Sequence, residues 1–340
     1  MGAMRRMAGP FTAIAPFLMG LVLTAAAFAQ SPSAQSSSTP SLDAAEMAAV
    51  GQYGERGAPL TVFERDGVLR VDGRGLKDAA LTSLGRSRYR IEGGGELMLE
   101  PAALRLDGTR LPRHDFGAEV EAAIHAAVRA DPAALRARAL AAKPPVETAR
   151  RKPADLVDLS TLDPTIRLDI RYAGSDNFMG LAVYERSAAY LQRPAAQALA
   201  RAAKALEAQG YGVLIHDAYR PWFVTWMFWE ATPPEDHMFV ADPAQGSRHN
   251  RGCAVDLTLY DLKTGEPAQM PSRYDEMSGR SYADFIGGTT RQRALRAILR
   301  EAMVAQGFEV YPEEWWHFDY GDWRSYGIGT ETFTELAQAK

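Results

Sequence analysis

Two separated groups of side chains in this sequence could together hold a metal ion. His249 and Asp256 stand seven residues apart in SRHNRGCAVD, and Glu314 and His317 stand three apart in EEWWH. A catalytic zinc takes about three protein ligands and leaves one position open for water. His249, Asp256 and His317 supply such a set, and imidazole and carboxylate suit Zn²⁺ where thiolates are scarce. Either half alone arises often by chance, so the residue pattern leaves open a zinc site or unrelated side chains.

Two further residues could carry out a hydrolysis beside such a metal. Glu314 lies three residues before His317, so a tight turn would aim its carboxylate at the water to be deprotonated. Arg220 stands in DAYRPW, between a short apolar strand and a proline that fixes its position. Its guanidinium could stabilise negative charge on a carbonyl oxygen. The alternative for Arg220 is an ion pair with Asp217 or another acid.

The other histidines and the single cysteine carry weaker signals. His114, His125 and His237 have no partner nearby in the sequence and are interpreted as surface residues. His216 ends a strand, where a hydrogen-bonded structural role is favoured over a catalytic one. Cys253 lies in an apolar, strand-like run and is expected to be a small buried residue, since one cysteine cannot form an internal disulfide.

A mixed domain must position these residues. Beyond about residue 155, strands and helices follow one another without regular βαβ spacing, which predicts an α+β domain with an antiparallel sheet. Helices are expected over 197–209 and 289–306, each ended by a glycine. No glycine-rich nucleotide motif follows a strand.

The first part of the chain divides by composition into segments. Two arginines, an apolar run and Ala27-Phe28-Ala29 indicate a secretory signal, and the short apolar core disfavours the alternative of an uncleaved membrane anchor. Alternating strands around Asp66-Gly67 predict a hairpin in a mostly-β module, which a helix over 117–142 completes. The predicted segments are a signal peptide over 1–29, a flexible linker over 30–45, the module of unknown function over 46–142, a linker over 143–154 and the second domain over 155–340.

Composition limits the partners and the location. The 340 residues suggest about two domains, and a net charge of −4 offers no generally basic surface for nucleic acid. We expect an exported protein, periplasmic or secreted, with no stable membrane span after cleavage of the signal. Nothing in the sequence indicates an oligomeric state.

The motif S-x-H-x-x-G-x-A-x-D over 247–256, followed by E-W-W-H over 314–317, resembles the zinc D-Ala-D-Ala dipeptidases, the VanX-type enzymes of the Hedgehog/DD-peptidase fold. DIRYAGSDNFMG (169–180), DAYRPW (217–222) and YDEMSGRSY (274–282) fit the same family in the same order. The resemblance covers about 155–336 and leaves out the first module. It implies an antiparallel-sheet zinc DD-peptidase domain flanked by helices.

The resemblance implies a role for each matching residue at the metal. His249, Asp256 and His317 would bind one Zn²⁺ per chain. Glu314 would be the general base and then the acid to the leaving amine, and Arg220 would stabilise the oxyanion.

The resemblance also implies substrate contacts, although a structural role stays open for both residues. Ser247 would touch the substrate near the metal, and Asp275 would pair with its free amino group. The implied reaction is hydrolysis of the D-Ala-D-Ala dipeptide to two D-Ala in peptidoglycan turnover, with peptidoglycan as a second candidate partner. The alternatives are an exported zinc D,D-carboxypeptidase or endopeptidase acting on stem peptides, and a non-catalytic wall-binding protein.

Overall fold

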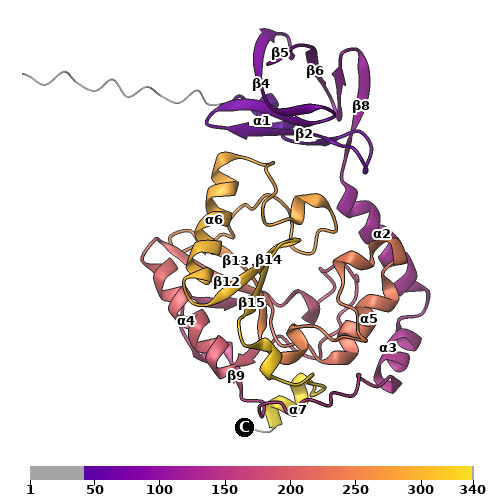
Figure 1. Ribbon diagram of the computed structural model, residues 1–340, viewed down its shortest axis with the longest axis vertical. Coiled ribbons are helices and arrows are strands. Elements are labelled where there is room, and N and C mark those ends of the chain that lie inside the picture. Colours follow the sequence, from indigo (N-terminus) through magenta and orange to yellow (C-terminus); the bar gives the residue numbers. More distant parts are fainter. Residues whose placement is uncertain (1–41, 339–340) are drawn as a thin grey trace, which may run out of the picture. The chain divides into compact units, whose positions relative to one another are not determined.

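The computed structural model describes residues 42–338, which form a β-barrel and a larger α/β domain (Figure 1). These residues all fall within one of the chain's two compact units, Thr39–Lys340. The predicted signal peptide and most of the predicted flexible linker lie outside the described residues. Helix α1 (Ala44–Ala49) precedes the barrel and begins with a capping box made by Asp43 and Glu46.

Eight short antiparallel strands form the barrel, which closes because β1 pairs with both β2 and β8. The predicted hairpin at Asp66-Gly67 is confirmed: Arg65 pairs with Val68, and both turn residues have positive φ, as a two-residue hairpin turn of this kind requires. Apolar side chains fill the interior. The strands are β1 (Gly51–Tyr53), β2 (Leu60–Arg65), β3 (Val68–Gly73), β4 (Leu76–Gly85), β5 (Arg88–Ile91), β6 (Glu96–Glu100), β7 (Ala103–Leu106) and β8 (Thr109–His114).

The single helix expected over 117–142 is two helices, α2 (Phe116–Ala130) and α3 (Pro132–Ala141). Asp131 ends the first and caps the second, where its side chain accepts a hydrogen bond from Ala134 N–H. Proline at the first position of α3 has no amide hydrogen to lose there. Buried side chains of both helices join the core of the α/β domain, whereas the sequence grouped this stretch with the barrel module.

The stretch 143–154, interpreted as a linker, is tied to the α/β domain. Glu147 accepts hydrogen bonds from Arg251 Nη1 at 2.8 Å and from Ile328 N–H at 2.9 Å. Arg251, which the sequence left without a role, is buried and therefore holds this segment in place.

A five-stranded sheet in the order β10-β12-β13-β15-β14 is the centre of the α/β domain. The expected antiparallel arrangement holds for three neighbouring pairs, but β10 and β12 run parallel. Strands β9 and β11 form a separate, two-stranded antiparallel sheet. The strands are β9 (Leu156–Asp158), β10 (Ile166–Leu168), β11 (Tyr190–Gln192), β12 (Tyr211–Asp217), β13 (Ala254–Asp261), β14 (Phe308–Tyr311) and β15 (Glu314–Tyr320).

Helices cover this sheet and supply its core. Helices α4 (Arg193–Glu207) and α6 (Thr290–Val304) pack on one another and on the sheet, and α5 (Trp222–Ala231) packs with α2 and α3 (Figure 1). The two helices predicted from periodicity are confirmed within a few residues. Their starts have local causes: Thr289 and Gln292 form a capping box at α6, and Pro194 lies in the first turn of α4. Helix α7 (Phe333–Gln338) is the last described element.

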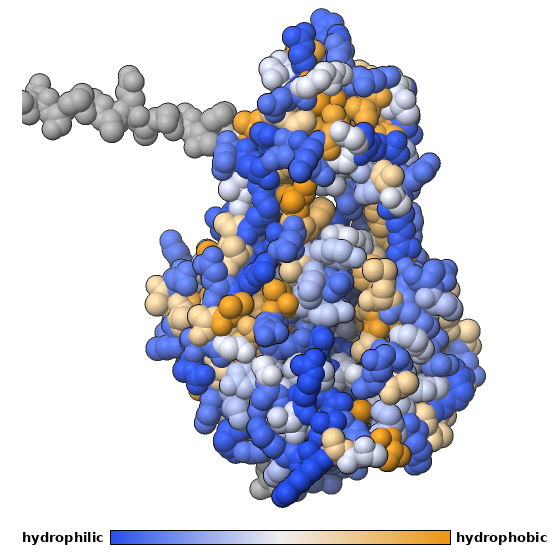
Figure 2. Space-filling model, in the orientation of Figure 1, coloured by the Kyte–Doolittle hydropathy of each residue, from blue (hydrophilic) through white to orange (hydrophobic). Residues whose placement is uncertain are grey.

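The described part of the chain has a mostly hydrophilic surface in the view of Figure 2. Hydrophilic residues cover most of the face in view, and apolar residues form small separate patches (Figure 2). Between residues 42 and 338, no helix has the length and apolar character needed to cross a bilayer.

Candidate metal centre and its cleft

Local backbone geometry brings His249 and Asp256 to one place. His249 begins a 3-10 turn that ends at Gly252, whose φ of 66° turns the chain into β13. A Cβ at residue 252 would lie 2.6 Å from Leu156 Cδ2, so this turn needs glycine. Asp256 then faces His317 directly, because the two residues pair in the β13–β15 ladder. Opposed residues of an antiparallel pair project to the same face, which joins the two halves of the predicted site.

The three predicted ligands form one buried cluster. His249 Nε2 lies 3.0 Å from His317 Nδ1 and 3.3 Å from Asp256 Oδ1, and His317 Nδ1 lies 3.0 Å from the same oxygen. All three side chains are buried, and their ligand atoms lie within 4.8 Å of one another.

In each imidazole, the nitrogen that points away from the cluster has a hydrogen-bond partner, and the nitrogen that points into the cluster is left as an acceptor. His249 Nδ1 lies 2.6 Å from Ala218 O, and His317 Nε2 lies 2.9 Å from Asp319 Oδ1. A proton on each outer nitrogen gives two neutral rings with lone pairs facing inward. Asp256 Oδ1 faces them and is buried without a hydrogen-bond donor of its own among the described residues. Three convergent acceptors repel one another unless a cation lies between them, so the donor set fits Zn²⁺.

Glu314 borders this cluster as the first residue of β15, so the tight turn expected over 314–317 is instead a strand. Its Oε2 lies 3.6 Å from His317 Nδ1, and the side chain is mostly buried. Burial raises the pKa of Glu314 to about 7, and the negative charge of Asp256 adds to this rise. A carboxyl with a pKa near neutrality can take up and release a proton at working pH.

Arg220 is held at the cleft by a buried acid. Its Nε and Nη2 donate to Asp217 Oδ2 at 2.9 and 2.8 Å, and its guanidinium packs on the Phe228 ring at 4.7 Å. The other Asp217 oxygen accepts from Tyr184 O–H at 2.7 Å. Nη2 also lies 3.9 Å from Asp256 Oδ2. The ion pair proposed as the alternative for Arg220 therefore exists, and it fixes the guanidinium beside the metal ligands.

Ser247 and Asp275 lie at the same cleft. Ser247 is buried, and its Oγ accepts from His249 N–H at 3.2 Å. Asp275 has a φ of 57°, and its Oδ2 accepts from Tyr172 O–H at 2.7 Å. Burial raises the pKa of Asp275 well above its usual range. Tyr274 donates to Asp256 Oδ2 at 3.0 Å, which links the Asp275 segment to the metal ligands.

All seven residues singled out in the sequence line one cavity of about 380 Å³. Of the two tryptophans in EEWWH, Trp316 lines this cavity, and Trp315 is buried with its Nε1 donating to Ser272 Oγ at 2.8 Å. These positions are compatible with the predicted roles, which geometry alone does not assign. The residues are Arg220, Ser247, His249, Asp256, Asp275, Glu314 and His317.

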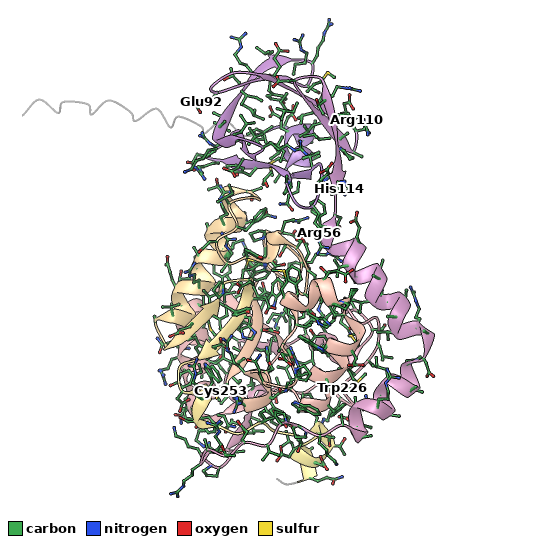
Figure 3. All side chains as sticks on the ribbon, turned by 45° about the vertical axis from the view of Figure 1, so that its right-hand side comes forward. Arg56, Glu92, Arg110, His114, Trp226 and Cys253 are labelled. Carbon is green, nitrogen blue, oxygen red and sulfur yellow. The ribbon has the colours of Figure 1, made fainter. Side chains whose placement is uncertain are left out.

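The weaker candidates have structural surroundings. Cys253 is fully buried inside the α/β domain, as expected (Figure 3). His216 is buried, approaches Asp169 O at 3.3 Å and packs on Tyr274. His237 Nε2 is bonded to backbone oxygens and is only partly exposed, so its prediction as a simple surface residue was incomplete.

From the sequence, Asp217 was named only as an alternative partner of Arg220, and Asp319 was not included. Both lie two or three residues from a predicted site residue, in DAYR and in HFD. For Asp319 the available signal was its position two residues after His317, because residues i and i+2 of a strand share a face.

The fold and the site define a metal-dependent hydrolase: a buried His–Asp–His set, a carboxyl and a guanidinium border one cleft. The sequence profile of the D-ala-D-ala dipeptidases matches residues 152–334, and the chain belongs to this family of zinc metallopeptidases. The resemblance seen in the motifs is thereby confirmed.

Individual relatives agree with the family assignment. The chain is 35% identical over 180 residues to the D-alanyl-D-alanine dipeptidase of Escherichia coli K12, which covers 53% of this chain and 92% of that protein. It is 36% identical over 175 residues to the D-alanyl-D-alanine dipeptidase of Enterococcus faecium, covering 45% and 85%. It is 35% identical over 186 residues to that of Streptomyces coelicolor, covering 48% and 90%. The family match begins at residue 152, after the barrel and helices α2 and α3.

Proposed function

We propose that this chain hydrolyses the D-Ala-D-Ala dipeptide to two D-Ala, with one zinc ion per chain held by His249, Asp256 and His317. One observation carries the proposal: the residues that the motifs assign to metal, base, oxyanion and substrate all line a single cavity. The relatives named as D-alanyl-D-alanine dipeptidases support the choice of substrate.

Zinc bound by these three residues supplies Lewis-acid polarisation of a carbonyl and lowers the pKa of water to about 7. Glu314 accepts the proton of the attacking water, because its carboxyl lies 3.6 Å from the ligand nitrogen of His317. The same carboxyl then donates this proton to the departing amine. A pKa raised by burial to about 7 lets one group perform both transfers.

Arg220 stabilises the negative charge on the former carbonyl oxygen. Asp217 and Phe228 hold its guanidinium in place before the reaction, so no reorganisation is needed when charge develops. Arginine keeps its charge throughout, which suits a stabiliser that must not exchange protons.

Asp275 selects a substrate with a free amino group. Its carboxyl is partly buried, and Tyr172 is its hydrogen-bond partner within residues 42–338. The ammonium of a dipeptide placed here favours the charged carboxylate and pairs with it, whereas an N-terminally extended peptide brings no counter-ion. This difference favours the free dipeptide over a stem peptide.

We further propose that the reaction takes place outside the cytoplasm, in peptidoglycan turnover. The support is the signal-like composition of residues 1–29. Finding the full-length chain in the cytoplasm would contradict the proposal, whereas an exported chain with its N-terminus at Gln30 agrees with it.

A direct comparison of substrates tests the proposed activity. The zinc-loaded chain is incubated in parallel with D-Ala-D-Ala and with a pentapeptide stem that ends in D-Ala-D-Ala, and D-alanine release is measured. We expect a much higher kcat/KM for the dipeptide. Cleavage of the stem alone would instead identify a D,D-carboxypeptidase, and release from neither would leave the wall-binding alternative.

A further inference from the structure

Arg248 lies in the metal-binding motif between Ser247 and His249 and has no role in the mechanism above. Its guanidinium lies over two aromatic rings, 5.2 Å from the centroid of Tyr311 and 5.2 Å from that of Trp323. Its Nη1 lies 2.9 Å from Asp319 Oδ2. The side chain lines the same cavity as the metal ligands. Two rings and an acid therefore hold a cation at the wall of the cleft.

The position of this cation is fixed relative to the metal site. Asp319 uses one oxygen for Arg248 and the other for His317 Nε2 at 2.9 Å. Asp319 also pairs with Ala254 in the β13–β15 ladder, so its backbone position is set by the sheet. Arg248 therefore lies on the outer side of His317, across that ring from the ligand nitrogen Nδ1.

Part of the Arg248 guanidinium is free to bind a ligand. The side chain is 34% exposed, and the described residues give its Nε and Nη2 no hydrogen-bond partner. Arg220, the other arginine of the cavity wall, directs both Nε and Nη2 to Asp217. The rest of the Arg220 guanidinium is assigned to the oxyanion, so among the described residues that line the cavity Arg248 is the arginine whose remaining donors have no role in the mechanism. A guanidinium with free donors matches the geometry of a carboxylate.

The acid and this cation are connected to different metal ligands. Asp275 is connected to the Oδ2 side of Asp256 through Tyr172 and Tyr274, whose hydroxyl oxygens lie 3.4 Å apart. Arg248 is connected to the Nε2 side of His317 through Asp319. A free dipeptide carries an ammonium at one end and a carboxylate at the other, with a single peptide bond between them. Asp275, Arg248 and the metal ligands line one cavity, so a dipeptide in it can present its ammonium to Asp275 and its carboxylate to Arg248.

We infer that Arg248 binds the free α-carboxylate of the dipeptide and restricts the enzyme to substrates that end in one. This inference rests on the proposed dipeptidase function and adds the recognition of the second substrate terminus. Carboxamides lack the anion, and peptides extended beyond the second residue carry it on a later residue, so both lose this contact.

The test replaces Arg248 with methionine, which keeps an unbranched, flexible apolar stem but removes the charge. D-Ala-D-Ala and D-alanyl-D-alaninamide are compared by kinetics and by calorimetric binding. Binding is measured in chains that also carry Glu314→Gln, so that it does not depend on turnover. We expect R248M to raise KM and Kd for the dipeptide about 10- to 100-fold, as the loss of a charge-assisted hydrogen-bonded pair does. Values for the amide and kcat for the dipeptide should change little.

Arg324→Met is the matched control, because Arg324 lies over the same Trp323 ring at 4.1 Å and does not line the cavity. R248K keeps the charge and should recover part of the affinity. Equal losses for dipeptide and amide, an unchanged Kd, or zinc loss from both R248M and R248K would overturn the inference. If the unmodified chain binds the dipeptide without cleaving it, the proposed function fails, while the binding comparison still decides the role of Arg248.

Discussion

Glutamine in place of Glu314 is expected to lower kcat for D-Ala-D-Ala about 10²- to 10⁴-fold, the range for loss of a positioned general acid–base group. The amide has nearly the same shape as the carboxyl but cannot accept the proton of the attacking water. The zinc content should stay at the level of the unmodified chain, because the ligand atoms belong to His249, Asp256 and His317. Steady-state kinetics and metal analysis of the same preparation check both statements.

Glu313 provides the control for this substitution. It is the adjacent residue with the same side chain, and it does not line the cavity. Glu313→Gln should therefore retain kcat. Complete zinc loss in Glu314→Gln would mean that Glu314 is a ligand rather than the base, and full activity would exclude it from the proton transfers.

Removing the guanidinium of Arg220 should lower kcat about 10²- to 10³-fold, as the loss of one oxyanion-stabilising donor does. KM should change much less, because the charge on the carbonyl oxygen develops in the transition state rather than in the bound substrate. The kinetics of Arg220→Ala and Arg220→Lys separate these effects. The lysine variant tests whether a positive charge alone, without the planar set of guanidinium donors, is sufficient to stabilise the oxyanion.

Arg220 also neutralises a buried acid, so its loss has a structural effect that must be separated from the catalytic one. Breaking a buried ion pair typically costs about 3–5 kcal/mol, and Arg220→Ala leaves Asp217 without its cation. Asp217→Asn in the same chain removes the uncompensated charge and should recover thermal stability without recovering kcat. A rise in KM at unchanged kcat would make Arg220 a substrate-binding residue.

The site was more predictable than the domain that holds it. Each half of the site is local in sequence: the turn at Gly252 relates His249 to Asp256, and the single strand β15 holds both Glu314 and His317. The prediction that His249 and Asp256 share a metal with His317 depended only on residue type, because few side chains bind zinc. Their actual link is the pairing of Asp256 with His317 across β13 and β15, a long-range register that no local pattern encodes.

Other features depend on contacts between distant segments. The mostly-β character of the first module and its hairpin at Asp66-Gly67 follow from alternation and turn residues. Closure of the barrel depends on pairing β1 with β8, about sixty residues apart, which composition does not reveal. The core in which α2 and α3 bury their apolar faces depends equally on tertiary packing. Asp319 was missed for a related reason. In the sequence it is an ordinary polar residue of an alternating strand, and only the structure shows its contact with the ring of His317.

Zinc titration of metal-stripped protein, followed by D-alanine release from D-Ala-D-Ala, tests the central claim most directly. The stripped chain should be inactive, and activity should rise in proportion to added Zn²⁺ until one ion is bound per chain. His317→Ala should bind zinc much more weakly and stay inactive at that ratio. Full activity of the stripped chain, or one tightly bound zinc without D-alanine release, would contradict the account.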